Sequence, residues 1–229
     1  MSPIHCRTDR HICCPFLFAE SEVIMIITIS RETGSGGHTV GQMLAKELGY
    51  TFYDKEIVAA VAQEMQVDET VVFENGENMS DKTYLDMVSG FIPFSRKQKI
   101  PFEEIKAAQD KLIRQIASKD NCVIVGRGAD DILKELPNAF HVFIHADMQH
   151  RVARVQRHEN VSGQEMRIQR ELEVKDHSRS MYYNYFCGKE WGKVENYNLS
   201  IDTSIFSKTQ SMELIIMAMK MMKEGMKNA

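Results

Sequence analysis

The stretch that most constrains the fold is "MIITISRETGSGGHTVGQMLAKELG" at residues 25–49. It opens with a short apolar and β-branched run, passes through a glycine cluster, and then switches to helical spacing at Val40, Leu44, Ala45 and Leu48. A continuous apolar run of this length indicates a strand buried on both faces, which is typical of a parallel sheet. A strand, a glycine loop and a helix in this order predict an α/β fold in which helices cover a parallel sheet.

The rest of the chain supplies the other elements of such a sheet. We expect four further strands, at 50–54, 122–125, 139–147 and 198–202. Helices are expected at 39–48, 55–66 and 102–120, after the glycine turn at 126–128, at 148–186 with a break near 160–165, and at 207–227. Ser162 and Glu165 have the spacing of a capping box, which predicts that a helix begins after the break.

Length and charge narrow the class of protein. A chain of 229 residues with 43% apolar composition supports a single domain, which we expect at 25–229, with an irregular insert at about 73–101 and a disordered extension at 1–24. A net charge of −4 does not indicate the basic surface that binds a long nucleic acid. No apolar run in the sequence is long enough to cross a membrane. We therefore expect a cytoplasmic protein with a small anionic ligand.

The glycine loop "RETGSGGHT" follows a strand and precedes a helix, which places backbone N–H groups and the positive helix end at one point. The standard phosphate loop, G-x-x-x-x-G-K-[ST], adds a lysine and a hydroxyl, but this loop contains no lysine. In one register Gly37 takes the lysine position and His38 the hydroxyl position. In the other, which we prefer, His38 takes the lysine position and Thr39 supplies the hydroxyl. The loop alone would also suit a tight turn; the flanking strand and helix favour an anion site.

Four stretches in this order resemble the cytidylate kinase-like family, a lysine-lacking branch related to bacterial cytidylate kinases among the P-loop nucleoside monophosphate kinases. They are "ITISRETGSGGHTVG", "YTFYDKEIV", "CVIVGRGADDIL" and "KDHSRSMYYNYFCGKEWGKVENYNLSIDTS", and they span roughly residues 25–204. Members of the family typically carry arginine where this chain has His38. The resemblance implies a P-loop NTPase three-layer sandwich, with a five-stranded parallel sheet and a helical lid at about 148–190.

The resemblance also implies roles for individual residues. The donor-phosphate loop would comprise Gly34, Ser35, Gly36, Gly37, His38 and Thr39, with Thr39 as the Mg²⁺ ligand. The acceptor would meet Asp54, Arg127 and Asp176, and the acid after the "GRG" turn is displaced to Asp130. The lid would bring catalytic cations to the transferring group from Arg151, Arg154, Lys175 and Arg179. Two alternatives stay open: Asp54 could cap the helix that begins at Lys55, and the arginines at 151 and 154 could be a solvated helix face.

These features predict a kinase that transfers the γ-phosphate of ATP, with Mg²⁺, to a small nucleotide such as CMP. The missing lysine favours a nucleotide-binding sensor without turnover as the alternative, and the unmatched insert leaves room for a non-nucleotide acceptor. The aromatic cluster from Tyr182 to Trp191 could stack on a base, but packing is the expectation. The methionine-rich helix from Met212 to Met226 is expected to pack on the sheet, with a homodimer as the alternative use.

Overall fold

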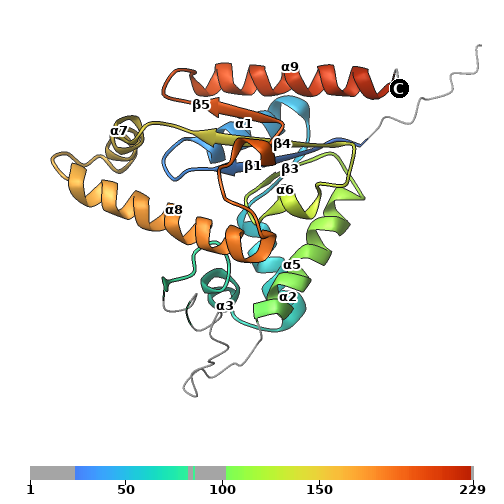
Figure 1. Cartoon of the computed structure of the whole chain (residues 1–229), viewed down its shortest axis with the longest axis horizontal. Coiled ribbons are helices and arrows are strands. Elements are labelled where there is room, and N and C mark those ends of the chain that lie inside the picture. The colour runs from blue at the N-terminus through green and yellow to red at the C-terminus, as the bar shows by residue number, and fades with distance from the viewer. Residues whose placement is uncertain (1–23, 82–84, 86–101, 228–229) are drawn as a thin grey trace, which may run out of the picture.

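The computed structural model describes residues 24–81, 85 and 102–227, and its centre is a five-stranded sheet (Figure 1). The strands are β1 (Ile26–Arg31), β2 (Thr51–Tyr53), β3 (Cys122–Val125), β4 (Ala139–His145) and β5 (Leu199–Asp202). They are all parallel, in the order β2-β3-β1-β4-β5. The predicted α/β fold with a five-stranded parallel sheet is confirmed. Because β1 lies between β3 and β4, the glycine loop that follows it emerges at the centre of the carboxyl edge.

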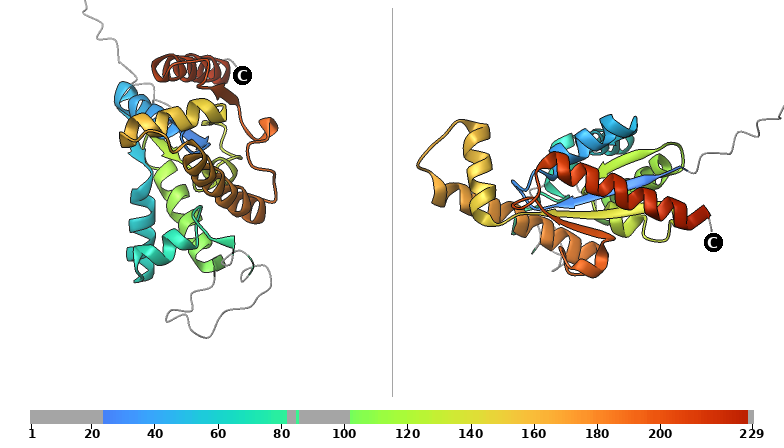
Figure 2. Two further views of the ribbon diagram at one scale, coloured as in Figure 1. Left: turned by 90° about the vertical axis from the view of Figure 1, so that its left-hand side faces the viewer. Right: turned by 90° about the horizontal axis from the view of Figure 1, so that it is seen from above.

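Alternating side chains of β1 pack into two separate cores. Ile27 and Ile29 face the core shared with α1 (Gly37–Leu48) and α9 (Lys208–Lys227). Ile26 faces the opposite core, which is covered by α2 (Lys55–Met65), α3 (Glu69–Glu74), α5 (Phe102–Ala117) and α6 (Ala129–Ile132). Figure 2 shows these helices on the two faces of the strands. A strand buried on both faces explains why "IITIS" contains three isoleucines and no charged residue.

Two helices leave the sheet and return across its carboxyl edge. The first, α7 (Met148–Glu159), projects beyond the strands, and α8 (Glu165–Cys187) runs back toward α5 (Figures 1 and 2). The pair holds together through a small apolar cluster of its own, built around Val152, Ile168 and Leu172. A 3₁₀ helix at Val194–Asn196 then leads into β5. This hairpin corresponds to the region that the sequence predicts as a lid.

Three boundaries differ from the sequence predictions. The strand predicted at 139–147 ends at His145, because Asp147 becomes the N-cap of α7 and accepts a hydrogen bond from the His150 amide at 2.9 Å. The capping box predicted at Ser162 is wrong: the N-cap of α8 is Gln164, which makes no side-chain capping bond. The insert predicted at 73–101 includes the end of α3, which the sequence analysis did not expect. Most of that insert, and residues 1–23 of the predicted extension, lie outside the described residues.

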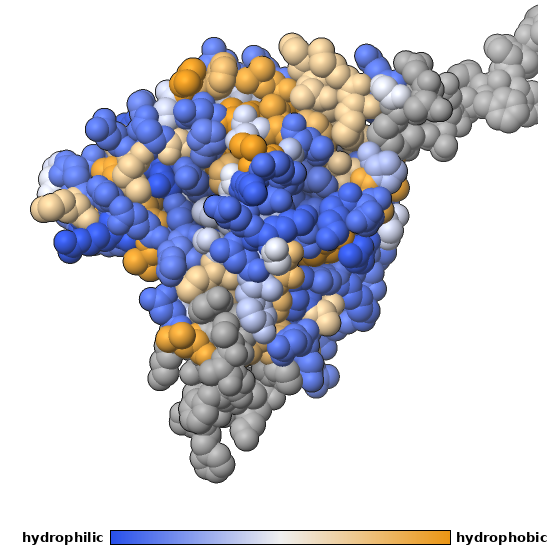
Figure 3. All heavy atoms as spheres, in the orientation of Figure 1, coloured by the Kyte–Doolittle hydropathy of each residue, from blue (hydrophilic) through white to orange (hydrophobic). Residues whose placement is uncertain are grey.

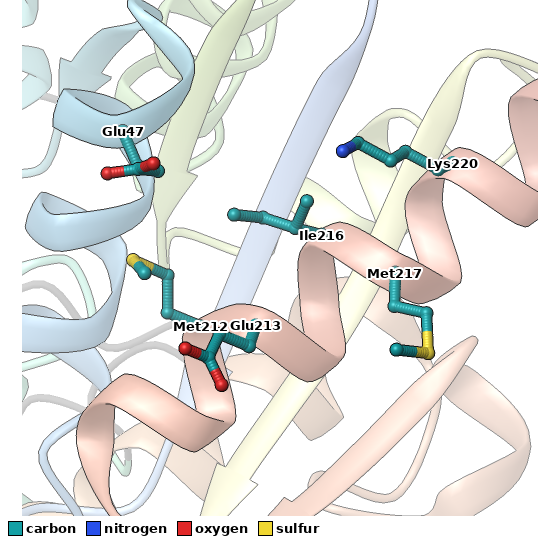
Figure 4. A pocket seen from close by; sticks show the side chains of 6 residues that line it. All are labelled: Glu47, Met212, Glu213, Ile216, Met217 and Lys220. Atoms are coloured by element: carbon teal, nitrogen blue, oxygen red, sulfur yellow. The ribbon is translucent and has the colours of Figure 1, made fainter.

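The methionine-rich helix α9 packs on the sheet, as expected from the sequence. Ile215 and Met219 are buried in the core it shares with α1, whereas Met217 is 57% exposed. Figure 4 shows a groove between α9 and α1, and in Figure 3 apolar residues are gathered along the same upper edge of the molecule. The homodimer stays a prediction. No helix in the described ranges combines the length and apolar character needed to cross a membrane.

Gly37 permits the close approach of α1 to β1, since an added Cβ would lie 2.6 Å from the Cβ of Arg31. We expect Gly37→Ala to lower the free energy of unfolding by about 1–3 kcal/mol through overpacking, measured by urea denaturation. Gly225→Ala is the control, because nothing lies within 4 Å of its added Cβ. That variant should be as stable as the parent or slightly more so, and equal destabilisation of both would contradict the packing argument.

Candidate functional site

A cavity of about 510 Å³ opens at the carboxyl edge of the sheet, where the glycine loop, α2, the β3–α6 turn and the lid hairpin meet. Open α/β sheets bind ligands at this edge, where the strand order reverses. The cavity wall includes most of the predicted site residues, namely Gly34, Gly36, Gly37, His38, Thr39, Asp54, Arg127, Arg154, Lys175 and Arg179. Three predicted residues do not line the cavity: Ser35, Arg151 and Asp176.

The glycine loop presents its backbone to this cavity. Gly34 and Gly36 have φ angles of 80° and 90°, in the left-handed region that favours glycine. The helix α1 begins at Gly37 without a side-chain cap and without an acidic residue in its first turn. Its positive end is therefore available to an anion. Ser35 faces inward instead: it is fully buried, and its hydroxyl donates to the Glu32 carbonyl at 2.8 Å.

Two cations of the cavity wall lie against Gly36 of the loop, and only one of them, Arg154, was predicted. Arg154 donates to the Gly34 carbonyl at 2.8 Å and to the Thr203 carbonyl at 3.2 Å. The other is Lys208, at the start of α9: an added Cβ on Gly36 would lie 3.3 Å from its Cε and 3.4 Å from Nη1 of Arg154. Within the described ranges, no carboxylate forms an ion pair with Arg154 or Lys208. This side of the cavity therefore has two cations without an ion-pair partner among the described residues, although Glu32 and Glu159 also line the cavity.

Across the cavity, three arginines from different elements converge on the buried carboxylate of Glu77. Arg31 at the end of β1 donates to Oε2 of Glu77 at 2.9 Å, and Nε of Arg179 in α8 lies 3.8 Å from the same oxygen. The backbone amide of Arg127, after β3, donates to Oε1. The three arginines line the cavity, whereas Glu77 does not. Glu77 therefore orients these arginines from behind the cavity wall.

The charges of this cluster change the ionisation of its members. Burial alone would raise the pKa of Glu77, but Arg31, Arg127 and Arg179 outweigh it and lower that pKa to about 2. Burial, together with the neighbouring Arg31, lowers the pKa of Arg179 to about 10, although Glu77 and Asp176 partly oppose this shift. Glu77 is thus ionised and the guanidinium of Arg179 is protonated at neutral pH.

Arg127 is held in an unusual position at the carboxyl end of β3. Its φ angle is 63°, and its residue is only 4% exposed. The side-chain amide of Gln109 donates to its carbonyl at 3.1 Å, which fixes the turn. Its Nε and Nη1 have no hydrogen-bond partner among the described residues. Unpaired buried donors are costly, and an anionic ligand in the cavity could supply the partner that this guanidinium lacks.

Two of the predicted residues instead fasten the lid hairpin to the glycine loop. Asp176 of α8 accepts hydrogen bonds from the amide and the hydroxyl of Thr33, both at 2.7 Å. Arg151 of α7 pairs with Asp176 and donates to the Thr33 carbonyl at 3.3 Å. Because Arg151 is buried in these contacts, the solvated helix face considered for it is wrong. In α8 the cavity is lined by Lys175 and Arg179, and in α7 it is lined by Arg154, Val155, His158 and Glu159.

The structure also shows where the side chains of Asp54 and His38 lie. Asp54 occupies the N-cap of α2 but makes no side-chain capping bond. Its carboxylate lies 3.3 Å from Nε2 of His38 and 3.8 Å from Nη2 of Arg31, so it faces the cavity. His38 is thereby turned toward Asp54. Thr39 adds a hydroxyl to the cavity wall, an oxygen ligand of the kind that Mg²⁺ accepts beside substrate phosphates and water.

The displaced acid Asp130 belongs to the protein interior. It is 4% exposed and accepts a hydrogen bond from the Tyr183 hydroxyl at 2.5 Å. Burial raises its pKa to about 6, against the opposing effect of that hydrogen bond. Tyr182 and Tyr183 are likewise buried, which agrees with packing rather than base stacking for this part of the aromatic cluster.

The sequence analysis missed Arg31, Glu77 and Lys208. Arg31 could have been found from its place directly after the central strand, at the edge where ligands bind. Glu77 follows a short helix in a segment without periodicity, and Lys208 begins the last helix, far along the chain from the loop it contacts. Nothing in local sequence distinguishes these two residues from exposed ones.

Comparison with known proteins agrees with this geometry. Residues 26–205 match the model of the cytidylate kinase-like family. A cytidylate kinase of Methanosarcina acetivorans is 22% identical over 194 residues, covering 85% of this chain and 96% of that protein. The crystal structure of an uncharacterized protein from Eubacterium ventriosum is similar with a TM-score of 0.62 and 27% identity, covering 86% of this chain and 98% of that chain. The resemblance inferred from the four sequence stretches is confirmed.

Replacing the buried carboxylate tests the arginine cluster. Glu77→Gln should lower the free energy of unfolding at neutral pH by about 3–5 kcal/mol, because it leaves buried arginines without their counterion. Since the pKa of Glu77 falls from 4.5 to about 2 on folding, its contribution is present above pH 4.5 and is lost as the pH falls toward 2. Chemical denaturation across this range should show the two proteins converging in acid. Glu171→Gln, which breaks an exposed pair with Arg167, is the control and should change little.

Asp130 should give the opposite pH dependence. Its pKa rises from 3.8 to about 6 on folding, so the stability it contributes is full below pH 3.8 and is lost as the pH rises through 6. Asp130→Asn keeps an oxygen for the Tyr183 hydroxyl and should remove this loss. Relative to the parent, we expect the variant to gain up to about 3 kcal/mol between pH 4 and pH 7 in denaturant titrations. A difference independent of pH would contradict the assignment.

Proposed function

Because the chain belongs to the cytidylate kinase-like family, we propose that it is an ATP-dependent kinase that phosphorylates a nucleoside monophosphate such as CMP. The observation that supports this proposal is the distribution of cations around one cavity. A glycine loop with Arg154 lies on one side, and Arg31, Arg127 and Arg179 lie on the other. Two phosphate-bearing ligands that must meet for phosphoryl transfer require two such cationic groups facing each other.

The residues of the cavity would act mainly by positioning and by neutralising charge. The N–H groups of the glycine loop would hold the donor phosphates, and Thr39 would hold the Mg²⁺ that neutralises charge on them. Arg127 would orient the acceptor, while Lys175 and Arg179 would reach the transferring group from the lid. An oxygen of the acceptor phosphate bonds to the γ-phosphorus as the bond to the β-phosphate oxygen breaks, which yields ADP and a nucleoside diphosphate. A phosphate monoester has its second pKa near 6, so the attacking oxygen needs no general base at neutral pH.

The absence of a lysine from the loop favours a second candidate, a sensor that binds nucleotide without turnover. Purified protein with ATP and Mg²⁺ should be assayed for ADP formation against CMP, UMP, AMP and GMP, beside thermal shifts with each nucleotide. We expect ADP formation that depends on at least one monophosphate. Binding without turnover on any acceptor would exclude the kinase and leave the sensor, and turnover only on hydroxyl-bearing acceptors would move the activity to a non-nucleotide substrate.

Arg127 provides a sharper test of the acceptor side. Arg127→Gln should raise the KM for the monophosphate by about 10- to 100-fold, as expected for a lost charge-assisted hydrogen bond, and should raise the KM for ATP much less. Steady-state kinetics with each substrate varied in turn would measure the split. Arg167→Gln, on the exposed face of α8, is the matched control and should leave both constants unchanged. Equal effects of Arg127→Gln on both substrates would contradict an acceptor role.

A further inference from the structure

The glycine loop has no lysine, but a lysine from the other end of the chain lies against it. Lys208 is the first residue of α9 and lines the same cavity as the loop. Its Cε would be 3.3 Å from a Cβ placed on Gly36, at the apex of the loop. The two residues of the loop itself that could carry positive charge are both turned to carboxylates. Arg31 donates to Glu77 at 2.9 Å, and Nε2 of His38 lies 3.3 Å from Oδ2 of Asp54. The cation nearest the loop apex from outside the lid is therefore Lys208.

Several hydrogen bonds hold Lys208 in this place. The helix α9 begins in a reciprocal capping box: the Ser207 hydroxyl accepts from the Gln210 amide at 3.2 Å, and the Ser207 amide donates to Oε1 of Gln210 at 2.9 Å. Upstream, the Thr203 hydroxyl donates to the Ser35 carbonyl at 2.6 Å. The segment between β5 and α9 is thus bonded to the glycine loop at Thr203. At its other end, Ser207 caps the helix that begins at Lys208.

The positive charges of Lys208 and Arg154 repel each other unless a bound anion neutralises them. Burial lowers the pKa of Lys208, and the nearby Arg154 and Arg157 lower it further. Burial and Arg157 also lower the pKa of Arg154. Lys208 stands at a helix N-terminus with no acidic residue in the first turn, where a cation opposes the helix dipole. The acceptor side differs, because there Glu77 and Asp176 neutralise the arginines. A polyphosphate would relieve the repulsion between Arg154 and Lys208.

We propose that Lys208 supplies, from the start of the last helix, the cation that the glycine loop lacks, and that with Arg154 it binds the phosphate chain of the donor nucleotide. This inference rests on the proposed function, because it needs a donor with phosphates in the cavity. It assigns donor binding jointly to Gly36 and Lys208, which are 172 positions apart in the sequence. The lysine acts from outside the loop, on the face of the cavity where Arg154 already bonds to the Gly34 carbonyl.

Equilibrium binding of Mg·ATP and of ADP to the full chain, measured by isothermal titration calorimetry, tests the proposal. Lys208→Met should weaken both by about 10- to 100-fold, the loss expected for one charge-assisted contact to phosphate, while the affinity for CMP stays within twofold. Lys208→Arg should recover most of the affinity because it retains the charge. Lys220→Met is the matched control, since it makes the same change on an exposed residue of the same helix, and it should bind like the parent.

The outcomes separate the two proposals. If the parent binds ATP and Lys208→Met binds it equally well, the role of Lys208 is overturned and the proposed function stands. If Lys208→Met loses ATP and CMP to the same extent, the residue is structural and the inference is again overturned. If the parent binds no nucleotide, the proposed function fails together with the inference. Thermal melts of the unliganded variants establish folding, and Lys208→Gln replaces Lys208→Met should the latter not fold.

Discussion

The candidate site depends on the buried carboxylate of Glu77, which lies behind the cavity wall. Glu77 contacts arginines from the end of β1, from the turn after β3 and from the helix α8, so it joins the central strand, the β3–α6 turn and the lid hairpin. Gly126 and Gly76 make this arrangement possible, because an added Cβ on either would collide with the cluster. A charge buried this deeply costs several kcal/mol unless it is paired, so the arginines and the glutamate must fold together. The position of each guanidinium in the cavity follows from that requirement.

The two sides of the cavity differ in how their charge is balanced. On the side of the cavity formed by Arg31, Arg127 and Arg179, the carboxylates of Glu77 and Asp176 pair with Arg31 and Arg179, while Nε and Nη1 of Arg127 have no hydrogen-bond partner among the described residues. On the loop side, the hydrogen bonds of Arg154 to other described residues go to carbonyl and hydroxyl oxygens, and Lys208 lies beside it. A balanced site can be rigid before its ligand arrives, whereas an unbalanced one gains most of its stabilisation from the ligand. The proposed function would use this asymmetry, because its donor carries more negative charge than its acceptor.

The lid is built into the same network. Asp176 bonds to the amide and hydroxyl of Thr33 in the loop, and Arg151 closes the contact from α7. Two arginines that looked equivalent in sequence therefore have different contacts. Arg151 fastens the hairpin to the loop, while Arg154, one turn further along the same helix, faces the cavity. Helical spacing places two such residues on the same side of the helix, and only their contacts with the loop show that Arg151 is buried in an ion pair while Arg154 lines the cavity.

Local sequence determined the strand and helix order, the anion-binding geometry of "GSGG" at the end of a buried strand, and the family, because these depend on residues close together in the chain. It also marked Asp54, Arg127, Arg154 and Arg179, since each falls at a strand end or in a recognisable stretch. The tertiary structure alone decided the partners. Glu77 and Lys208 lie in segments with no distinguishing pattern, and they reach the site only because the packing of α3 and α9 brings them there. Charge pairing acts through space, so the sequence could name several of the charged residues but not which cations are paired with carboxylates and which are not.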